Sequence, residues 1–230
     1  MRHDGAAAQV AGGAFHGVIR LAWALDSGDV DDIAHALAYV AAVTHDDQPA
    51  QLAPKAGSER SLFALALRLQ QSGIERPPGR LISARLHGVA VDPRFVAIAD
   101  DIAVHDGTLT DVAAFGARLY AAADDFASLH VVTGADAVMV LAPHFSDQLV
   151  PARAAARAAL GCFVLAGLPD LDGIADAMPV DDDAAITKAA IVCNDDHVCK
   201  LMASCLRHAR RTGDRAFRAI ATRATRRGSS

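Results

Sequence analysis

The sequence predicts an all-α fold, built as a single domain of packed antiparallel helical hairpins. The chain has 230 residues, of which 52% are hydrophobic and only 5% aromatic, and this length can bury a substantial core. Long segments are rich in alanine and show little alternation of β-branched residues, which favours helices over strands. Apolar residues recur at helical spacing between glycine and proline breaks. We expect one helical domain over residues 1–230, with a loose lead-in at 1–12 and a loose tail at 224–230.

The first predicted hairpin spans residues 14–43. Its first helix is indicated by apolar residues at helical spacing, namely Phe15, Val18, Ile19, Ala22 and Leu25. Gly28 suits the C-cap of this helix, because glycine readily adopts the left-handed conformation that ends many helices. Asp29 can then cap a second helix that runs to about Val43. Residues 44–60 are polar, contain two prolines, and are expected to form a loop.

The middle of the chain is predicted to continue as short helices. Residues 61–71 form an amphipathic helix, whereas the apolar residues of 81–91 fit either a helix or an extended segment. A helix is expected over 95–104, followed by a turn at 106–108. Asp111 is expected to cap the next helix, which reaches about Ala123.

The apolar stretch 126–141 contains two residues that bear chemistry, His130 and Asp136. Six residues separate them, so on a straight helix their side chains lie about 240° apart. They converge only if the backbone bends. Thr133-Gly134 is the cheapest place for such a bend, because glycine is mobile and a threonine hydroxyl can bond to the backbone.

The last third of the chain is predicted as an alanine-rich helix to about Ala166, a loop to Asp183, a helix over 184–192, and two further helices. Asp195 or Asp196 is the expected N-cap of the first of these two. Thr212-Gly213-Asp214 separates it from a final arginine-rich helix. Those arginines indicate either an anion-attracting surface or solvated helix faces that run into a frayed tail.

Composition restricts the class of protein. The formal net charge is −5, so nothing indicates nucleic acid as a partner. The four cysteines follow no disulfide or zinc-finger spacing, and the N-terminus lacks the apolar stretch of a signal peptide, so we expect reduced thiols in a cytoplasmic protein. Charged residues interrupt the apolar runs before about 18 residues, which argues against a membrane span. No phosphate-binding glycine loop and no dinucleotide fingerprint is present.

His197 and Lys200 are three residues apart and share one face of a predicted helix, beside an apolar stripe. A buried lysine is costly unless it is neutralised, paired or chemically modified. Lys200 is therefore either an unusual buried group or a lysine that reaches past a capped helix start to solvent.

Three of the ten histidines stand out because each lies among apolar residues in a helical pattern: His16, His130 and His197. The other histidines are expected at the surface, including His35 and His208 on helices beside charged neighbours. Three imidazoles with the carboxylate of Asp136 suit iron, manganese or zinc, and an open coordination position favours non-haem iron and oxygen chemistry. The alternative is a set of hydrogen-bonded core histidines. Thiol catalysis by Cys193 or Cys199, which flank His197, is the weaker hypothesis.

Three segments together resemble the questin oxidase-like family, and they occur in the family's order. They are Phe15-His16-Gly17-Val18-Ile19-Arg20 with Ala24-Leu25-Asp26-Ser27-Gly28-Asp29, then Leu129-His130-Val131-Val132-Thr133-Gly134-Ala135-Asp136-Ala137, and Asp195-Asp196-His197-Val198-Cys199-Lys200-Leu201. The resemblance implies a mostly helical oxidoreductase that acts on polycyclic aromatic polyketides such as anthraquinones. It implies either a Baeyer-Villiger-type, NADPH-linked ring-opening oxidase or a non-haem iron dioxygenase with a carboxylated lysine.

Carried over by resemblance, His16, His130 and His197 would be metal ligands, and Lys200 would be carbamylated and bind the metal through oxygen. Asp136 stands where the family pattern has a second histidine, which implies either an oxygen ligand or an altered site. The substrates would be a small aromatic molecule and dioxygen.

The chain is also shorter than typical members of the family, so pocket walls would be missing or supplied by another subunit in a homo-oligomer. Arg20, one turn beyond His16, would pair with a phenolate or an acidic ligand, or else join two helices by a salt bridge. The alternative to an oxygenase is a non-catalytic binding or interaction module on the same scaffold.

Overall fold

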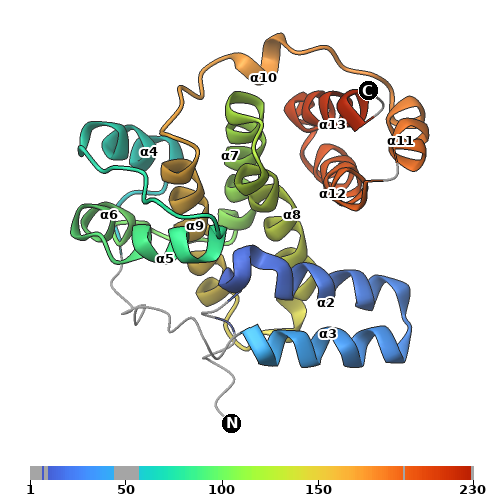
Figure 1. Ribbon diagram of the computed structural model, residues 1–230, viewed down its shortest axis with the longest axis horizontal. Helices are drawn as coiled ribbons and strands as arrows, with labels where there is room; N and C mark the ends of the chain where they lie inside the picture. Colours follow the sequence, from blue (N-terminus) through green and yellow to red (C-terminus); the bar gives the residue numbers. More distant parts are fainter. Residues whose placement is uncertain (1–6, 8–9, 44–56, 194, 229–230) are drawn as a thin grey trace.

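A computed structural model of the chain describes residue 7 and residues 10–43, 57–193 and 195–228, and among these residues it contains helices and no β-strand (Figure 1). In chain order the helices are the short 3-10 turn η1 (Gly12–Phe15), α2 (His16–Ser27), α3 (Val30–Val43), α4 (Leu62–Gln71), α5 (Ile82–Ala90), α6 (Pro93–Ala99), α7 (Thr108–Ala123), α8 (Phe126–Leu141), the 3-10 turn η2 (Ala142–His144), α9 (Leu149–Leu165), α10 (Ile174–Ala177), α11 (Asp183–Val192), α12 (Asp196–Thr212) and α13 (Arg215–Gly228). The predicted all-α fold is confirmed.

Helices α7, α8 and α9 pack together at the centre of the molecule (Figure 1). Helices α4 and α5 pack on α9. On the other side, α2 and α12 both pack on α8, and α13 packs on α7. Short connections make antiparallel hairpins of α2 with α3, α7 with α8, and α12 with α13, as the sequence predicted. The centre of the core is aromatic as well as aliphatic, since Phe115 and Phe163 are fully buried with ring centroids 5.8 Å apart.

Most of the predicted helix caps are where the sequence placed them, but Asp111, expected to cap α7, lies inside the first turn of that helix, and the N-cap is Gly107. Gly28 and Gly213 end α2 and α12 with φ of 71° and 73°, values that only glycine adopts without cost. Asp29 Oδ1 accepts from the backbone N–H of Asp31 at 2.8 Å at the start of α3. Of the two acids proposed for α12, Asp195 is the cap, and its Oδ1 accepts from His197 N at 2.8 Å.

Several predicted boundaries need correction. The ambiguous segment 81–91 is the helix α5, and the helix expected over 95–104 is the shorter α6, which begins at Pro93 and ends at Ala99. Asp92 caps it by accepting from Arg94 N at 2.8 Å. Most of the loop expected over 44–60 lies outside the described residues.

The arginine-rich C-terminal segment is part of the core. Ala216, Phe217 and Ile220 are fully buried, and α13 continues to Gly228, so the expected loose tail at 224–230 is wrong as far as residue 228. Its arginines pair with aspartates far away in the sequence, among them Arg223 with Asp124 at 2.9 Å. Sequence alone did not show these partners, because they come from the α7–α8 turn, from Asp181 before α11 and from Asp183 at its first position.

Residues 126–144, which include α8 and η2, form one helical stretch long and apolar enough to cross a membrane by length and composition. Asp136 interrupts this stretch, as expected from sequence, but it is the only Asp, Glu, Lys or Arg there, so the interruption alone does not argue against a span. In the fold 72% of the apolar window is buried against protein. The stretch is therefore the central helix of the core, which explains why it is apolar on all sides.

Candidate metal centre

Three histidines that are distant in sequence meet at one point of the fold. His16 lies at the start of α2, His130 on α8 and His197 at the start of α12. Each offers one ring nitrogen, and these nitrogen atoms all lie within 4.8 Å of one another. His16 Nε2 and His130 Nε2 are only 3.0 Å apart. The three residues singled out from sequence are thus brought together.

A left-handed turn positions His16. Gly13, Ala14 and Phe15 have φ of 57°, 57° and 66°, and for the two non-glycine residues this conformation stores strain. The turn brings the carbonyl of Gly13 back over the ring, so that its oxygen lies 2.7 Å from His16 Nδ1. The imidazole is therefore oriented by backbone rather than by a mobile side chain.

His130 is held by its own helix and is 2% exposed. Its Nδ1 lies 2.6 Å from the carbonyl oxygen of Phe126, one turn earlier. α8 runs without interruption through Thr133 and Gly134, so the bend considered there is absent. Gly134 instead makes room for Phe15, because a Cβ at this position would lie 2.9 Å from Phe15 Cβ and closer still to its ring. The glycine thus seats the turn that precedes His16 against the helix that carries His130.

His197 is oriented by an acidic residue beside it. Its Nδ1 lies 3.0 Å from Oδ1 of Asp196. The other oxygen of Asp196 binds Lys200 Nζ at 2.5 Å. Lys200, Asp196 and His197 therefore form a chain of polar contacts on the first turn of α12.

All three imidazoles share one feature: Nδ1 faces an oxygen, a backbone carbonyl for His16 and His130 and a carboxylate for His197. When Nδ1 donates its proton to that oxygen, Nε2 keeps its lone pair free, which is the usual arrangement of metal-binding histidines. The 3.0 Å approach of two Nε2 lone pairs would be repulsive unless a cation or a shared proton lies beside them.

The electrostatics favour neutral rings. Burial holds the pKa of His130 down to about 4 and also lowers the pKa of His16, although the backbone carbonyl that each ring faces opposes part of the effect. Neutral imidazole is the form that binds a metal. Three nitrogen atoms that each lie about 2.1 Å from one metal ion are separated from one another by roughly 3.0–3.4 Å. The ring nitrogens of the cluster lie within 4.8 Å of one another, so a movement of His197 by roughly 1–2 Å brings them to that separation. The donor set fits a metal ion.

Sequence reasoning missed Phe126. Its ring centroid lies 4.3 Å from that of His130, 4.8 Å from that of His197 and 6.4 Å from that of His16. The side chain is nevertheless 45% exposed, so it covers the histidine cluster with one face open to solvent. The spacing of four residues between Phe126 and His130 was the available signal, since it places both on one helix face.

Asp136 does not join the cluster, and its predicted place among the ligands is corrected. On the straight helix its side chain points away from His130, and it is 1% exposed. Ser204 Oγ donates to its Oδ2 at 3.0 Å, and Arg207 Nε donates to both oxygens at 3.0 and 3.2 Å. The carboxylate is therefore already saturated by α12.

Lys200 and Arg20, the two residues proposed for catalysis, both lie near the histidines. The side chain of Lys200 is about one-third exposed and paired with Asp196, so it is not a buried lysine without a partner. Arg20 is exposed, and its guanidinium carbon lies 4.6 Å from the centre of the Tyr39 ring. It thus joins α2 to α3 by a cation–π contact, where the sequence had indicated a salt bridge.

His208, expected at the surface, is fully buried on α12. Its ring stacks on Phe217, with centroids 5.0 Å apart. Neither ring nitrogen makes a hydrogen bond within the part of the chain that the structure describes, and Nε2 lies 3.9 Å from Asp136 Oδ1. Burial lowers the pKa of His208 to about 4. The expectation failed because its neighbours in sequence are charged, whereas its own helix face packs on α13.

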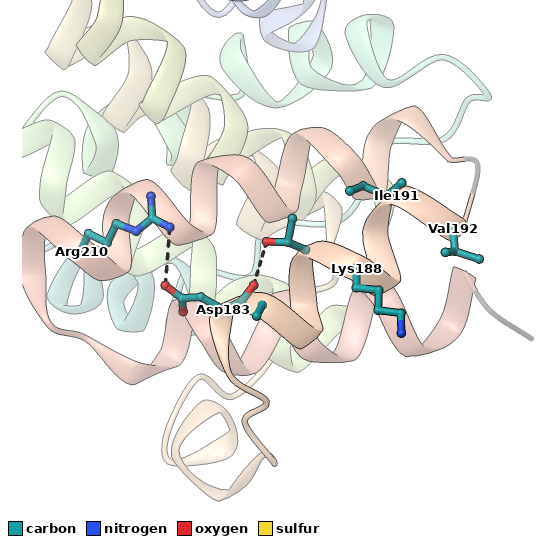
Figure 2. A pocket seen from close by; sticks show the side chains of 7 residues that line it. Asp183, Lys188, Ile191, Val192 and Arg210 are labelled. Atoms are coloured by element: carbon teal, nitrogen blue, oxygen red, sulfur yellow. Dashed lines mark hydrogen bonds and ion pairs between the residues drawn. The ribbon is translucent and has the colours of Figure 1, made fainter.

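An open groove of about 500 Å³ follows α11 beside α12, and Figure 2 shows Asp183 in it, facing Arg210. Its lining consists of Asp183, Ala184, Thr187, Lys188, Ile191, Val192 and Arg210. These residues supply an ion pair and aliphatic side chains. The histidine cluster, and not this groove, brings together side chains that could hold a metal ion.

Comparison with known protein families gives a match over most of the chain. The family model described as questin oxidase-like matches residues 2–205, a span that contains all three histidines. Searches of curated proteins and of solved structures found no match.

Proposed function

This chain belongs to the questin oxidase-like family, whose name indicates an oxidoreductase, and from this premise we propose that it is a metal-dependent oxygenase of a polycyclic aromatic or quinone-like small molecule. The observation that carries the proposal is the shared orientation of His16, His130 and His197. In each, Nδ1 faces an oxygen, and one ring nitrogen of each histidine lies within 4.8 Å of those of the other two.

We propose non-haem iron as the metal, bound by these three imidazoles. A nitrogen set with open positions suits iron(II) in oxygen chemistry better than it suits structural zinc, which is normally four-coordinate and closed. When bound, iron would supply the redox chemistry that activates dioxygen. Burial favours the neutral rings of His16 and His130 and so keeps these two ligands in the binding form.

The residues around the cluster have distinct roles in this proposal. The exposed face of Phe126 offers an aromatic surface against which a flat substrate can stack beside the metal. Lys200 holds Asp196, which in turn fixes the ring of His197. The paired ammonium group is the form that the contact with Asp196 stabilises, so we assign Lys200 as a positioning residue rather than as a carbamylated ligand. Arg20 at the rim adds positive charge that attracts a phenolate.

The test is metal analysis of the purified protein after reconstitution with iron(II) under anaerobic conditions. We expect one ion per chain, and loss of that ion in His130→Ala and in His197→Ala. His87→Ala, at an exposed position on α5, is the matched control and should bind as the parent protein does. Oxygen uptake with an anthraquinone, measured with and without NADPH, then tests turnover.

Each result has a separate meaning. A protein that binds no metal, with stability unchanged in both histidine variants, contradicts the metal centre and favours a non-catalytic module. Metal binding with ligand binding but without oxygen uptake contradicts the oxygenase and favours a small-molecule binding protein.

A further inference from the structure

Cys193 and Cys199 approach each other although they lie on different helices. Cys193 is the C-cap of α11, and Cys199 is in the first turns of α12. Both thiols donate to the same oxygen, the carbonyl of Ala190, at 3.1 and 3.3 Å. The two sulfur atoms are therefore no farther apart than the sum of these two distances.

The two thiols are also accessible. Cys193 and Cys199 are both partly exposed, whereas the remaining cysteines, Cys162 and Cys205, are buried. An oxidant in solution can thus reach this pair and not the other two. In the reduced protein both thiols bind a carbonyl in the last turn of α11.

We propose that Cys193 and Cys199 form a disulfide on exposure to a hydroperoxide, and that this bond weakens metal binding at the neighbouring histidine cluster. The second part rests on the proposed function. One thiol attacks the outer peroxide oxygen, the O–O bond breaks, and a sulfenic acid forms with release of water from hydrogen peroxide. The second thiol attacks that sulfur, the S–O bond breaks, the S–S bond forms, and a second water leaves. Two electrons pass from the thiols to the peroxide.

The direction of the effect follows from the packing. A disulfide requires a sulfur separation of about 2.05 Å, so it draws the first turns of α12 toward the end of α11. α11 packs on α12 and α13, whereas α8 packs on α12 from another side (Figure 1). His197 lies inside the segment that the bond would enclose, so it moves away from His130. Metal binding needs the opposite movement, because the ring nitrogens must come closer together.

The experiment treats the purified full chain with hydrogen peroxide or with dithiothreitol, removes the reagent, and maps cysteines by mass spectrometry after alkylation. We expect a Cys193–Cys199 peptide lighter by two hydrogens, with Cys162 and Cys205 alkylated only after denaturation. Cobalt(II) titration should then show roughly tenfold weaker binding to the oxidised form, the low end of effects from disturbing the surroundings of a metal ligand. Dithiothreitol should restore the affinity.

Cys193→Ser is the main variant, and Cys199→Ser repeats the test from the other helix. Each variant should bind cobalt(II) with the affinity of the reduced parent protein. Treatment with peroxide should not change that affinity. Overoxidation of each thiol, without the loss of two hydrogens from the Cys193–Cys199 peptide, overturns the disulfide. A disulfide that leaves cobalt(II) affinity unchanged overturns the coupling. A disulfide in a protein that binds no metal in either state contradicts the metal centre, and with it the coupling, while the modification site stands.

Discussion

Arg207 on α12 binds Asp136 on α8 through two guanidinium nitrogens, with Nε at 3.0 and 3.2 Å and Nη2 at 2.5 Å. Its Nη1 reaches Asp26 on α2 at 2.8 Å. These three helices also carry His16, His130 and His197. In each helix the histidine comes earlier in the chain than the residue that takes part in these ion pairs, which is Asp26, Asp136 or Arg207. One arginine thus fixes the three helices relative to one another beyond the histidine cluster.

Asp136→Asn should therefore lower stability rather than remove a ligand. Breaking a buried ion pair costs roughly 3–5 kcal/mol, and partial exposure of Arg207 places the expected loss near the lower end, at about 3 kcal/mol. Guanidinium unfolding measures it. The folded variant should still bind one metal ion. Arg68→Ala, which breaks an exposed pair with Asp101, is the control and should cost at most about 1 kcal/mol. Loss of metal with unchanged stability would identify Asp136 as a ligand.

Gly134→Ala should destabilise the protein by about 1–3 kcal/mol, the usual cost of overpacking a core. The added methyl group would overlap the Phe15 ring and push the left-handed turn before His16 away from α8. Thermal unfolding and iron(II) affinity should both fall. Gly12→Ala is the matched control, because a Cβ there meets nothing within 4 Å. If Gly134→Ala and Gly12→Ala have the same thermal stability and the same iron(II) affinity, Gly134 does not hold Phe15 in place.

His208 should make stability fall in mild acid. Its pKa is about 4 in the fold because of burial, against 6.5 as the reference value, so the unfolded chain binds the proton more readily. The contribution of the neutral ring to the free energy of unfolding is complete above pH 6.5. It is lost as the pH falls toward 4, by up to about 1.4 kcal/mol per pH unit.

The measurement is the free energy of unfolding of the parent and of His208→Leu between pH 4 and 8. The difference between the two curves isolates this residue from His16 and His130, whose pKa values are also lowered. We expect a flatter curve for the variant. His87→Leu, at an exposed position, should keep the parent slope. Parallel curves for the parent and His208→Leu would show that the ring binds a proton as readily in the fold as in the unfolded chain.

Lys200→Met should weaken metal binding by roughly 10- to 100-fold, the usual range for loss of a group that orients a ligand. Lys200→Arg should keep affinity within a few-fold, because a guanidinium can pair with Asp196 as the ammonium does. Arginine cannot take the place of a carbamylated lysine. Equal loss in both variants, together with a mass increase of the parent chain in bicarbonate, would therefore make Lys200 a carbamylated ligand.

Phe126→Leu should weaken binding of an anthraquinone by about 1 kcal/mol, the typical value of an aromatic pair beyond its buried area. Fluorescence titration of the metal-loaded protein measures this, and the metal affinity itself should not change. Phe63→Leu is the control, because Phe63 is similarly exposed on α4 and its ring packs on Phe115. An effect of equal size in both variants would contradict stacking at Phe126.

The sequence by itself determined the helical class of the fold, most of the helices and several of their caps. Apolar periodicity depends on local spacing, and caps such as Gly28 and Asp195 act on backbone groups within a few residues. It also marked His16, His130 and His197, because an imidazole in an apolar helical pattern must have a reason to be there. These inferences held because their physical causes are local.

Only the tertiary structure decided which groups face each other. Whether Asp136 met His130 or Arg207 depended on the path of α8 and on the placement of α12, two elements far apart in the chain. The burial of His208 and the partners of the C-terminal arginines were set in the same way. Pairing of charges and burial of polar rings are properties of packed surfaces, and packing brings together residues whose separation in sequence carries no signal.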